Sequence, residues 1–230
     1  MMNRFNPSLL EKLEWENKKI SKNNIRTTPI SQGEKLGGEF HLIMQQIGLG
    51  LPVELFLKAY PQIDKWVEVA KPFLDIPGSK QWNTEAQYLY KSQLLYANYD
   101  LIIYQEKQVI GLDWTIQKTS NFQLLENSFH TQLRLFLLHE RTQLSASEIS
   151  LVYLFVNTGD VYQFTYSKEK HQAFKERLEA TLLPFLAEVE DFPKQTSSSC
   201  TLTPQEAHDK WLAKEISAEE YLAAIPEVEL

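Results

Sequence analysis

Two aspartates stand in neighbouring apolar runs of YDLIIYQEKQVIGLDWTIQKT, residues 99–119. Asp100 lies near the start of the first run, Asp113 near the end of the second, and the polar residues 105–108 separate the runs. Runs rich in β-branched residues and joined by a short polar turn predict an antiparallel hairpin. Its two carboxylates would lie at one end, where they could share a divalent cation. Mg²⁺ and Mn²⁺ prefer such oxygen ligands, so we expect one of them as the cofactor.

A divalent ion held in this way can activate water and neutralise the charge of a phosphodiester. A lysine two residues after the second carboxylate would share its strand face and help to activate that water. This position holds Thr115. Lys118 stands three residues further on, so a regular strand would point its amine to the opposite face. A bulge, or a strand that ends at Thr115, would let Lys118 reach the site, and otherwise it is a solvated turn lysine.

Composition excludes several classes of protein. The 230 residues carry 43% hydrophobic and 23% charged residues, which is typical of a globular domain. The formal net charge of −7 argues against nucleic-acid binding by bulk electrostatics, although a local basic groove remains compatible with it. The one cysteine, Cys200, cannot form an internal disulfide or a four-cysteine zinc or iron–sulfur site. We find neither a signal-type segment nor an apolar run of membrane-spanning length, and we expect a soluble, cytoplasmic protein with no membrane partner.

The order of elements indicates an α/β fold. Pro7 with its neighbour Asn6 predicts a helix start, and a second helix is expected from about residue 36 to Gly48 or Gly50. Further helices are predicted over 52–73 with a break at Pro61, over 126–141 and over 168–190, and strands over 86–96, 99–105, 108–116, 150–156 and 161–166. We therefore expect a mixed sheet of about five strands flanked by helices.

A change of composition suggests a domain boundary. The segment DFPKQTSSSCTL, residues 191–202, has the Ser, Thr and Pro content of a linker, and capping signals at Thr203-Pro204 and Ser217–Glu220 predict two short helices after it. We divide the chain into a domain of residues 1–192 and a linker with a helical tail of residues 193–230.

A segment upstream of the acid pair adds to the pattern. Asp100 followed by Asp113-Trp114-Thr115, with KLGGEFHLIMQQ before them, resembles the PD-(D/E)XK nuclease superfamily in its RecB-like branch, and a cyanobacterial-type set of nuclease-like proteins in particular. The resemblance covers roughly residues 5–190. It implies a restriction-endonuclease-like core and a magnesium-dependent deoxyribonuclease acting on DNA. It places His41, Asp100 and Asp113 on the metal and gives catalysis to Asp100, Asp113 and, in place of the missing lysine, Lys118.

The chain also departs from that superfamily. The helix ENSFHTQLRLFLLHER stands where the superfamily has a glutamine-and-tyrosine helix, yet these positions fall at His130 and Arg134. Trp15 occupies the first helix and Cys200 stands alone, so no iron–sulfur cluster of the kind found in some relatives can form. Thr115 stands at the lysine position, which favours a member of the fold without catalysis.

Each remaining candidate has a structural alternative. Glu85 is an auxiliary carboxylate or an ordinary acidic residue at a strand start, and Gln132 is a further auxiliary candidate. Arg134 could contact a phosphate, but we expect a surface arginine. His41 is a ligand or a histidine held at the start of its helix, and we expect Trp114 to pack against a helix rather than stack on a base.

Three functions remain open from the sequence. The first is a metal-dependent DNA nuclease, and the second is a degenerate member of the same fold that serves as a nucleic-acid or protein interaction module. The third is an α/β protein with no relation to nucleases. The retained acid pair favours the first, whereas Thr115, the acidic balance and the lost cysteine cluster favour the second.

Overall fold

The computed structural model describes residues 3–17, 32–118, 121–142 and 144–186, without the side chains of residues 32–34. The chain divides into a unit of Met1–Leu186 and a second unit of Ala187–Leu230, and all described residues lie in the first. The predicted linker and helical tail of residues 193–230 fall outside the described residues, and the boundary at 192 stays a prediction.

A mixed sheet of six strands forms the centre of this unit, which confirms the predicted fold class. The strands are β1 (Arg4–Phe5), β2 (Ser79–Tyr90), β3 (Gln93–Tyr104), β4 (Val109–Thr115), β5 (Ile149–Phe155) and β6 (Asp160–Thr165). Their order is β1-β3-β4-β5-β6, and β2 pairs with β3. β1 is parallel to β3, β4 is parallel to β5, and the other pairs are antiparallel.

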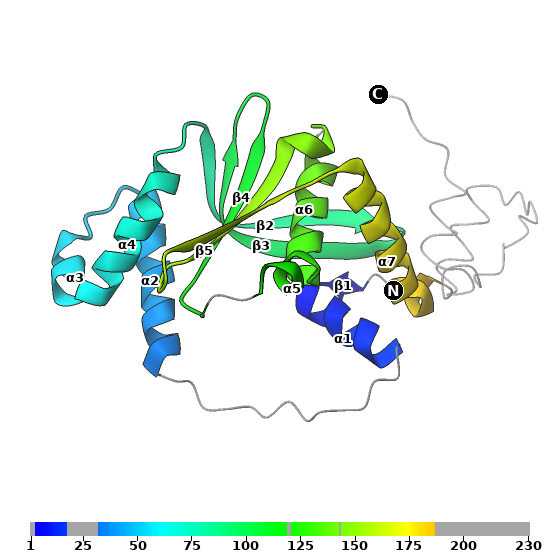
Figure 1. Cartoon of the computed structure of the whole chain (residues 1–230), viewed down its shortest axis with the longest axis horizontal. Coiled ribbons are helices and arrows are strands. Elements are labelled where there is room, and N and C mark those ends of the chain that lie inside the picture. The colour runs from blue at the N-terminus through cyan, green and yellow to red at the C-terminus, as the bar shows by residue number, and fades with distance from the viewer. Residues whose placement is uncertain (1–2, 18–31, 119–120, 143, 187–230) are drawn as a thin grey trace, which may run out of the picture. The chain divides into compact units, whose positions relative to one another are not determined.

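Helices cover both faces of the sheet (Figure 1). They are α1 (Pro7–Asn17), α2 (Gln32–Gly48), α3 (Glu54–Ala59), α4 (Pro61–Leu74), α5 (Phe122–Glu126), α6 (Phe129–Arg141) and α7 (Lys168–Leu186), with a 3₁₀ turn, η1, at Ala146–Glu148. As predicted, Asn6 caps α1 by accepting the Leu9 N–H at 2.8 Å, and Pro61 separates α3 from α4. None of the described helices has the length and apolar character needed to cross a membrane.

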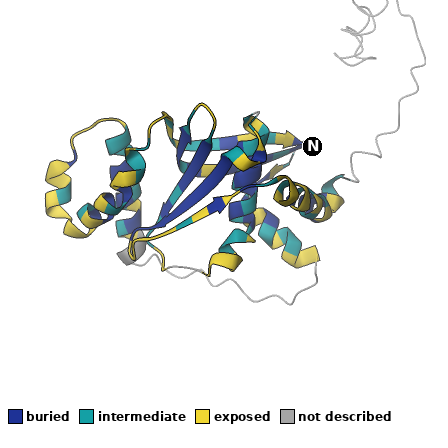
Figure 2. Cartoon of the chain, turned by 45° about the horizontal axis from the view of Figure 1, so that its top comes forward, coloured by how far each residue is buried: buried dark blue, intermediate teal, exposed yellow. Residues whose placement is uncertain are grey.

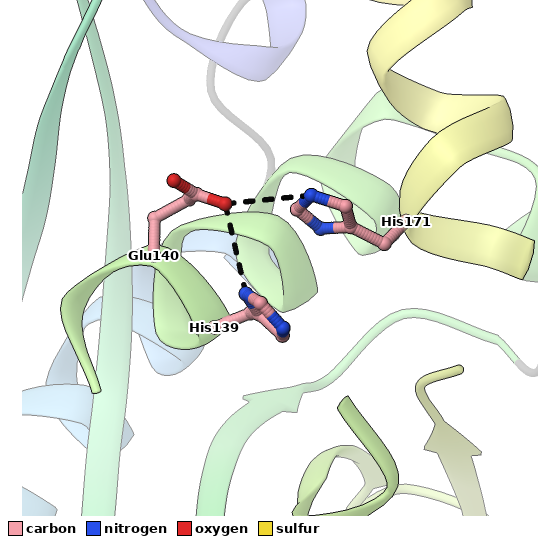
Figure 3. A group of neighbouring side chains, drawn as sticks. All are labelled: His139, Glu140 and His171. Carbon is pink, nitrogen blue, oxygen red and sulfur yellow. Dashed lines mark ion pairs between the residues drawn. The ribbon is translucent and has the colours of Figure 1, made fainter. Parts of the chain in front are cut away.

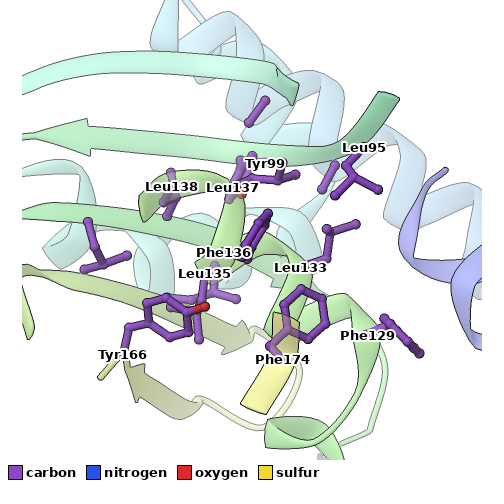
Figure 4. Close-up of a cluster of buried hydrophobic side chains, with 14 of the residues drawn as sticks. Leu95, Tyr99, Phe129, Leu133, Leu135, Phe136, Leu137, Leu138, Tyr166 and Phe174 are labelled. Carbon is purple, nitrogen blue, oxygen red and sulfur yellow. The ribbon is translucent and has the colours of Figure 1, made fainter. Parts of the chain in front are cut away.

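Two hydrophobic cores lie on the two faces. The first core joins the sheet to α1, α6 and α7, and Leu133, Phe136 and Phe174 are fully buried in it (Figure 4). The second core joins the sheet to α2 and α4 through Phe40, Ile43 and Trp66. β3, β4 and β5 are correspondingly mostly buried between the cores, whereas β2, β6 and the outer sides of the helices are largely half-buried or exposed (Figure 2).

The hairpin formed by β2 and β3 changes, along its length, which of its faces packs on each core. Ala97 and Tyr99 belong to the first core, whereas Leu101 and Ile103 belong to the second. Alternate residues of a regular strand share one face, so the face presented to each core changes at Asp100. The residue opposite on β2 is Asn83, whose φ of 42° is left-handed and rare outside glycine, and this pair alone is missing from the surrounding β2–β3 register.

The strands differ from the prediction over residues 79–98 and at the start of the chain. The predicted strand 86–96 is wrong, because Lys91 and Ser92 (φ 45° and 66°) form the hairpin turn inside it. The predicted break at 97–98 lies within β3, and β2 begins at Ser79, well before the apolar run. The two-residue strand β1 was missed, because so short a segment shows no alternation. The helix predicted over 126–141 is split, and Ser128 caps α6.

Candidate functional site

The acid pair lies where β3 and β4 separate. Their pairing runs from Tyr104 opposite Val109 to Leu101 opposite Leu112 and stops there. The next positions in the same register are Asp100 and Asp113. Beyond them the edge of β3 is free of β4 until β1 pairs with Leu94 and Leu95. The hairpin therefore brings the two carboxylates to the mouth of a fork in the sheet.

Asp100 is held by two N–H groups. The backbone N–H of Trp114 donates to Oδ2 at 2.9 Å, which replaces the ladder bond that the fork removes. Oδ1 lies 3.0 Å from Nδ1 of His41, which comes from α2. The side chain is 15% exposed. These contacts fix the orientation of the Asp100 carboxylate toward the fork.

Asp113 faces α6 and meets a buried guanidinium. Nη2 of Arg134 lies 3.3 Å from Oδ1 of Asp113. The same side chain donates from Nε to the carbonyl of Asn98 at 2.8 Å and from Nη1 to the Tyr153 hydroxyl at 2.9 Å. Arg134 thus connects β3, β4 and β5 across the fork and supplies a positive charge next to the acid pair.

The two carboxylates affect each other's protonation. Burial raises the pKa of Asp113 to about 6; the charge of Arg134 opposes this rise, and the charge and hydrogen bond of Asp100 add to it. The pKa of His41 is raised above its usual value, chiefly by its hydrogen bond to Asp100. A proton on Asp113 would therefore compete with a cation below about pH 6.

The other sequence candidates lie apart from the acid pair. β4 does end at Thr115, whose Oγ1 accepts the Gln117 N–H at 3.1 Å, and Lys118 is exposed beyond that end. Glu85 pairs with Arg4 at 3.3 Å, and Gln132 accepts a hydrogen bond from Arg177 at 2.8 Å. Among the described residues, no contact joins Lys118, Glu85 or Gln132 to Asp100 or Asp113.

Arg134 is a residue of the site whose role was mistaken at the sequence level. We expected a surface arginine, but its side chain is only 12% exposed, because α6 packs directly over the fork. The resemblance offered one signal, because it aligned Arg134 with a position expected to lie beside an active site. Trp114 packs as predicted: it is 3% exposed and its ring lies 6.4 Å from that of Phe40 on α2.

The donor set suits a hard divalent cation at the acid pair. Two carboxylates at one point, with water in the remaining positions, are typical of Mg²⁺ and Mn²⁺ sites. The ligand atoms of His41, Asp100 and Asp113 do not all lie within 4.8 Å of one another, since within the described ranges only a different group meets that limit. His41 contacts Asp100, and its own ligation of the ion stays a prediction.

Comparisons with known proteins give distant structural likeness. No protein-family model matches the chain, and no curated protein matches its sequence. It is similar to a crystal structure from Eubacterium rectale described provisionally as an exonuclease, at 12% identity over 87% of this chain and 83% of that one, with a TM-score of 0.44. It is also similar to the structure of SSO0001, at 10% identity over 95% and 88% of the two chains, with a TM-score of 0.35. Any functional conclusion therefore depends on the site.

Proposed function

We propose that the protein is a nuclease-like phosphodiesterase that acts on DNA with Mg²⁺ or Mn²⁺ at Asp100 and Asp113. The observation that carries this proposal is the position of both carboxylates at the fork between β3 and β4. A bound divalent ion would supply a water nucleophile and neutralise phosphodiester charge. DNA is the expected partner.

The protein side chains have distinct parts in this scheme. Asp100 and Asp113 would hold the ion, and the hydrogen bonds from Trp114 and His41 orient Asp100. Arg134 keeps Asp113 in place through their ion pair. Its guanidinium cannot act as a base, because the neighbouring Asp113 carboxylate and phenols raise its already high pKa further, although burial opposes this.

We expect the activity to be weak. Thr115 offers a neutral hydroxyl where a lysine would supply charge, and this hydroxyl accepts the Gln117 N–H. Loss of one such electrostatic contact typically lowers a rate by about 10²- to 10³-fold. Arg134 also occupies one oxygen of Asp113, which a metal ion must then share or displace.

A second candidate function is a binding module without catalysis. It is favoured by the same ion pair, because Arg134 already neutralises Asp113 and bridges three strands without a metal ion. In that case the fork is a structural remnant, and the protein would bind DNA or another protein through its surface.

The test is cleavage of end-labelled single- and double-stranded linear DNA in Mg²⁺ and in Mn²⁺. We expect slow cleavage by the wild type, no cleavage by Asp113→Asn, and an increase of about 10²-fold in Thr115→Lys. Lys118→Ala should match the wild type, because Lys118 is exposed beyond the end of β4. Asp75→Asn, at an exposed position after α4, is the matched control for Asp113→Asn.

The outcomes separate the candidates. Strong wild-type cleavage that is lost in Lys118→Ala would show that Lys118 is the catalytic amine. Cleavage that survives Asp113→Asn would exclude the acid pair as the active site. No cleavage by either the wild type or Thr115→Lys, with DNA binding retained, would favour the binding module.

A further inference from the structure

A second group of ligand-type side chains lies at the far end of α6. His139 and Glu140 come from its last turn, and His171 comes from the first turn of α7 (Figure 3). One ligand atom from each lies within 4.8 Å of the other two, and this is the one such group in the described part of the chain. Arg134 precedes His139 by five residues, about 7.5 Å along the helix, so this group is separate from the acid pair.

The distances within the group suit a tetrahedral ion. Oε1 of Glu140 lies 3.4 Å from Nε2 of His171 and 3.6 Å from Nδ1 of His139. Zinc binds nitrogen and oxygen ligands at about 2.0–2.2 Å, which places ligands of a tetrahedron about 3.3–3.5 Å apart. The carboxylate oxygen of Glu140 is therefore already at nearly the required separation from one nitrogen of each imidazole.

One ring nitrogen of His139 has no hydrogen-bond partner. This nitrogen, Nδ1, is buried, and its 3.6 Å separation from Glu140 is longer than a hydrogen bond. Buried polar atoms are almost always paired, and an ion is one of the few explanations for an exception. A metal ion facing Glu140 Oε1 would satisfy this nitrogen.

The surroundings hold the ligands in orientation. The Tyr166 hydroxyl lies 3.2 Å from Nδ1 of His171, and the Phe136 ring stacks on His171 at 5.3 Å, leaving Nε2 directed toward Glu140 (Figure 3). The Tyr88 phenol, from β2, lies near enough to Glu140 for this carboxylate to raise its pKa. Metal-bound histidines are commonly oriented through their second nitrogen in this way. The side chains are 17–26% exposed, so the group lies just beneath the surface.

We propose that His139, Glu140 and His171 form a binding site for one zinc-class divalent ion, with water in the fourth position. Two imidazoles and one carboxylate favour Zn²⁺ over Mg²⁺, which prefers oxygen ligands and octahedral geometry. The ion would tie the end of α6 to the start of α7 and stabilise the first core. The site does not depend on the proposed nuclease function.

The test uses the full chain without an affinity tag and with Cys200→Ser, which removes its one thiol. Zn²⁺ is titrated by calorimetry, and Co²⁺ is titrated by visible absorption. We expect one equivalent of each to bind, a tetrahedral Co²⁺ spectrum, and a melting temperature that rises with Zn²⁺. His139→Gln and His171→Gln should each lower the Zn²⁺ affinity by about 100-fold or more, since even outer-shell changes cost 10- to 100-fold. His130→Gln, on the same helix but outside the group, should change nothing.

Two results would overturn the proposal. The first is a wild type that binds neither ion saturably, and the second is Zn²⁺ binding of unchanged affinity in His171→Gln. Far-UV circular dichroism establishes that each variant is folded. Glu140→Gln removes the carboxylate ligand with almost no change in side-chain size. Asp113→Asn should retain the Zn²⁺ site, which separates it from any binding at the acid pair.

Discussion

The guanidinium of Arg134 lies 3.3 Å from the carboxylate of Asp113 and closes the fork at which β3 and β4 part. Asp113 is thereby neutralised from within the protein, while Asp100 beside it is held by two N–H groups. Any metal ion at the fork must therefore compete with a cation that the chain itself supplies.

Removal of Arg134 should destabilise the protein and strengthen metal binding. In Arg134→Gln, the partly buried Asp113 is left without its partner, which typically costs up to about 3–5 kcal/mol of unfolding free energy. Urea unfolding should show this loss, and Mn²⁺ should restore more stability to the variant than it adds to the wild type. Arg4→Gln, which breaks the exposed pair with Glu85, should cost less than about 1 kcal/mol. Equal losses in the two variants would contradict a buried ion pair at the fork.

The stability of the protein should carry a pH dependence that originates at Asp113. Its folded-state pKa of about 6 lies above the unfolded value of about 3.9. Between these values the folded chain keeps a proton that the unfolded chain has released. The stability contributed by this proton is therefore complete below about pH 4 and is lost as pH rises through 6, by up to about 3 kcal/mol.

The measurement is urea unfolding of the wild type and Asp113→Asn from pH 4 to pH 8. The unfolding free energy of the wild type, relative to that of Asp113→Asn, should fall as pH rises over this range. The difference between the two should become constant above about pH 7. A difference that does not change with pH would show that Asp113 titrates normally. Asp75→Asn, at an exposed position, serves as the control for loss of a carboxylate.

Gly111 allows α6 to approach the sheet closely enough for Arg134 to reach the fork. A Cβ at Gly111 would lie 3.0 Å from side-chain atoms of Tyr99, Leu138 and Leu151, all of them buried. Gly111→Ala should therefore lower the unfolding free energy by about 1–3 kcal/mol. In Gly38→Ala, where nothing lies within 4 Å, alanine should instead stabilise α2 by about 0.5–1 kcal/mol. Thermal melts of the two variants should move in opposite directions, and a stabilised Gly111→Ala would contradict the close packing.

Local patterns predicted the parts of the fold that depend on near neighbours. The cap at Asn6, the break at Pro61 and the strands on both sides of residues 105–108 follow from residue types a few positions apart. The strand error at 86–96 has a physical cause. Lys91 and Ser92 adopt left-handed backbone angles without glycine, so the turn lacks its usual sequence signal.

The site was predictable only in part, because its geometry depends on contacts distant in sequence. The hairpin indicated that Asp100 and Asp113 would lie near one another, but the chain alone could not show that β3 leaves β4 at that position. The place of Arg134 depends on how α6 packs over the fork, and helix packing is not a local property. The group of His139, Glu140 and His171 could not be predicted either, because the two histidines are 32 positions apart in sequence and lie on different helices.

The most direct test of the central claim is a Mn²⁺ titration followed by electron paramagnetic resonance, which reports free Mn²⁺. It is made on the full chain with His171→Gln, so that the second group of ligands does not contribute. We predict one bound equivalent at pH 7.5, weaker binding at pH 5.5 where Asp113 carries its proton, and no specific binding in Asp100→Asn or Asp113→Asn. Two results would contradict the claim that this fork is a metal site. One is no Mn²⁺ binding by the chain with an intact acid pair, and the other is Mn²⁺ binding that neither Asp100→Asn nor Asp113→Asn changes.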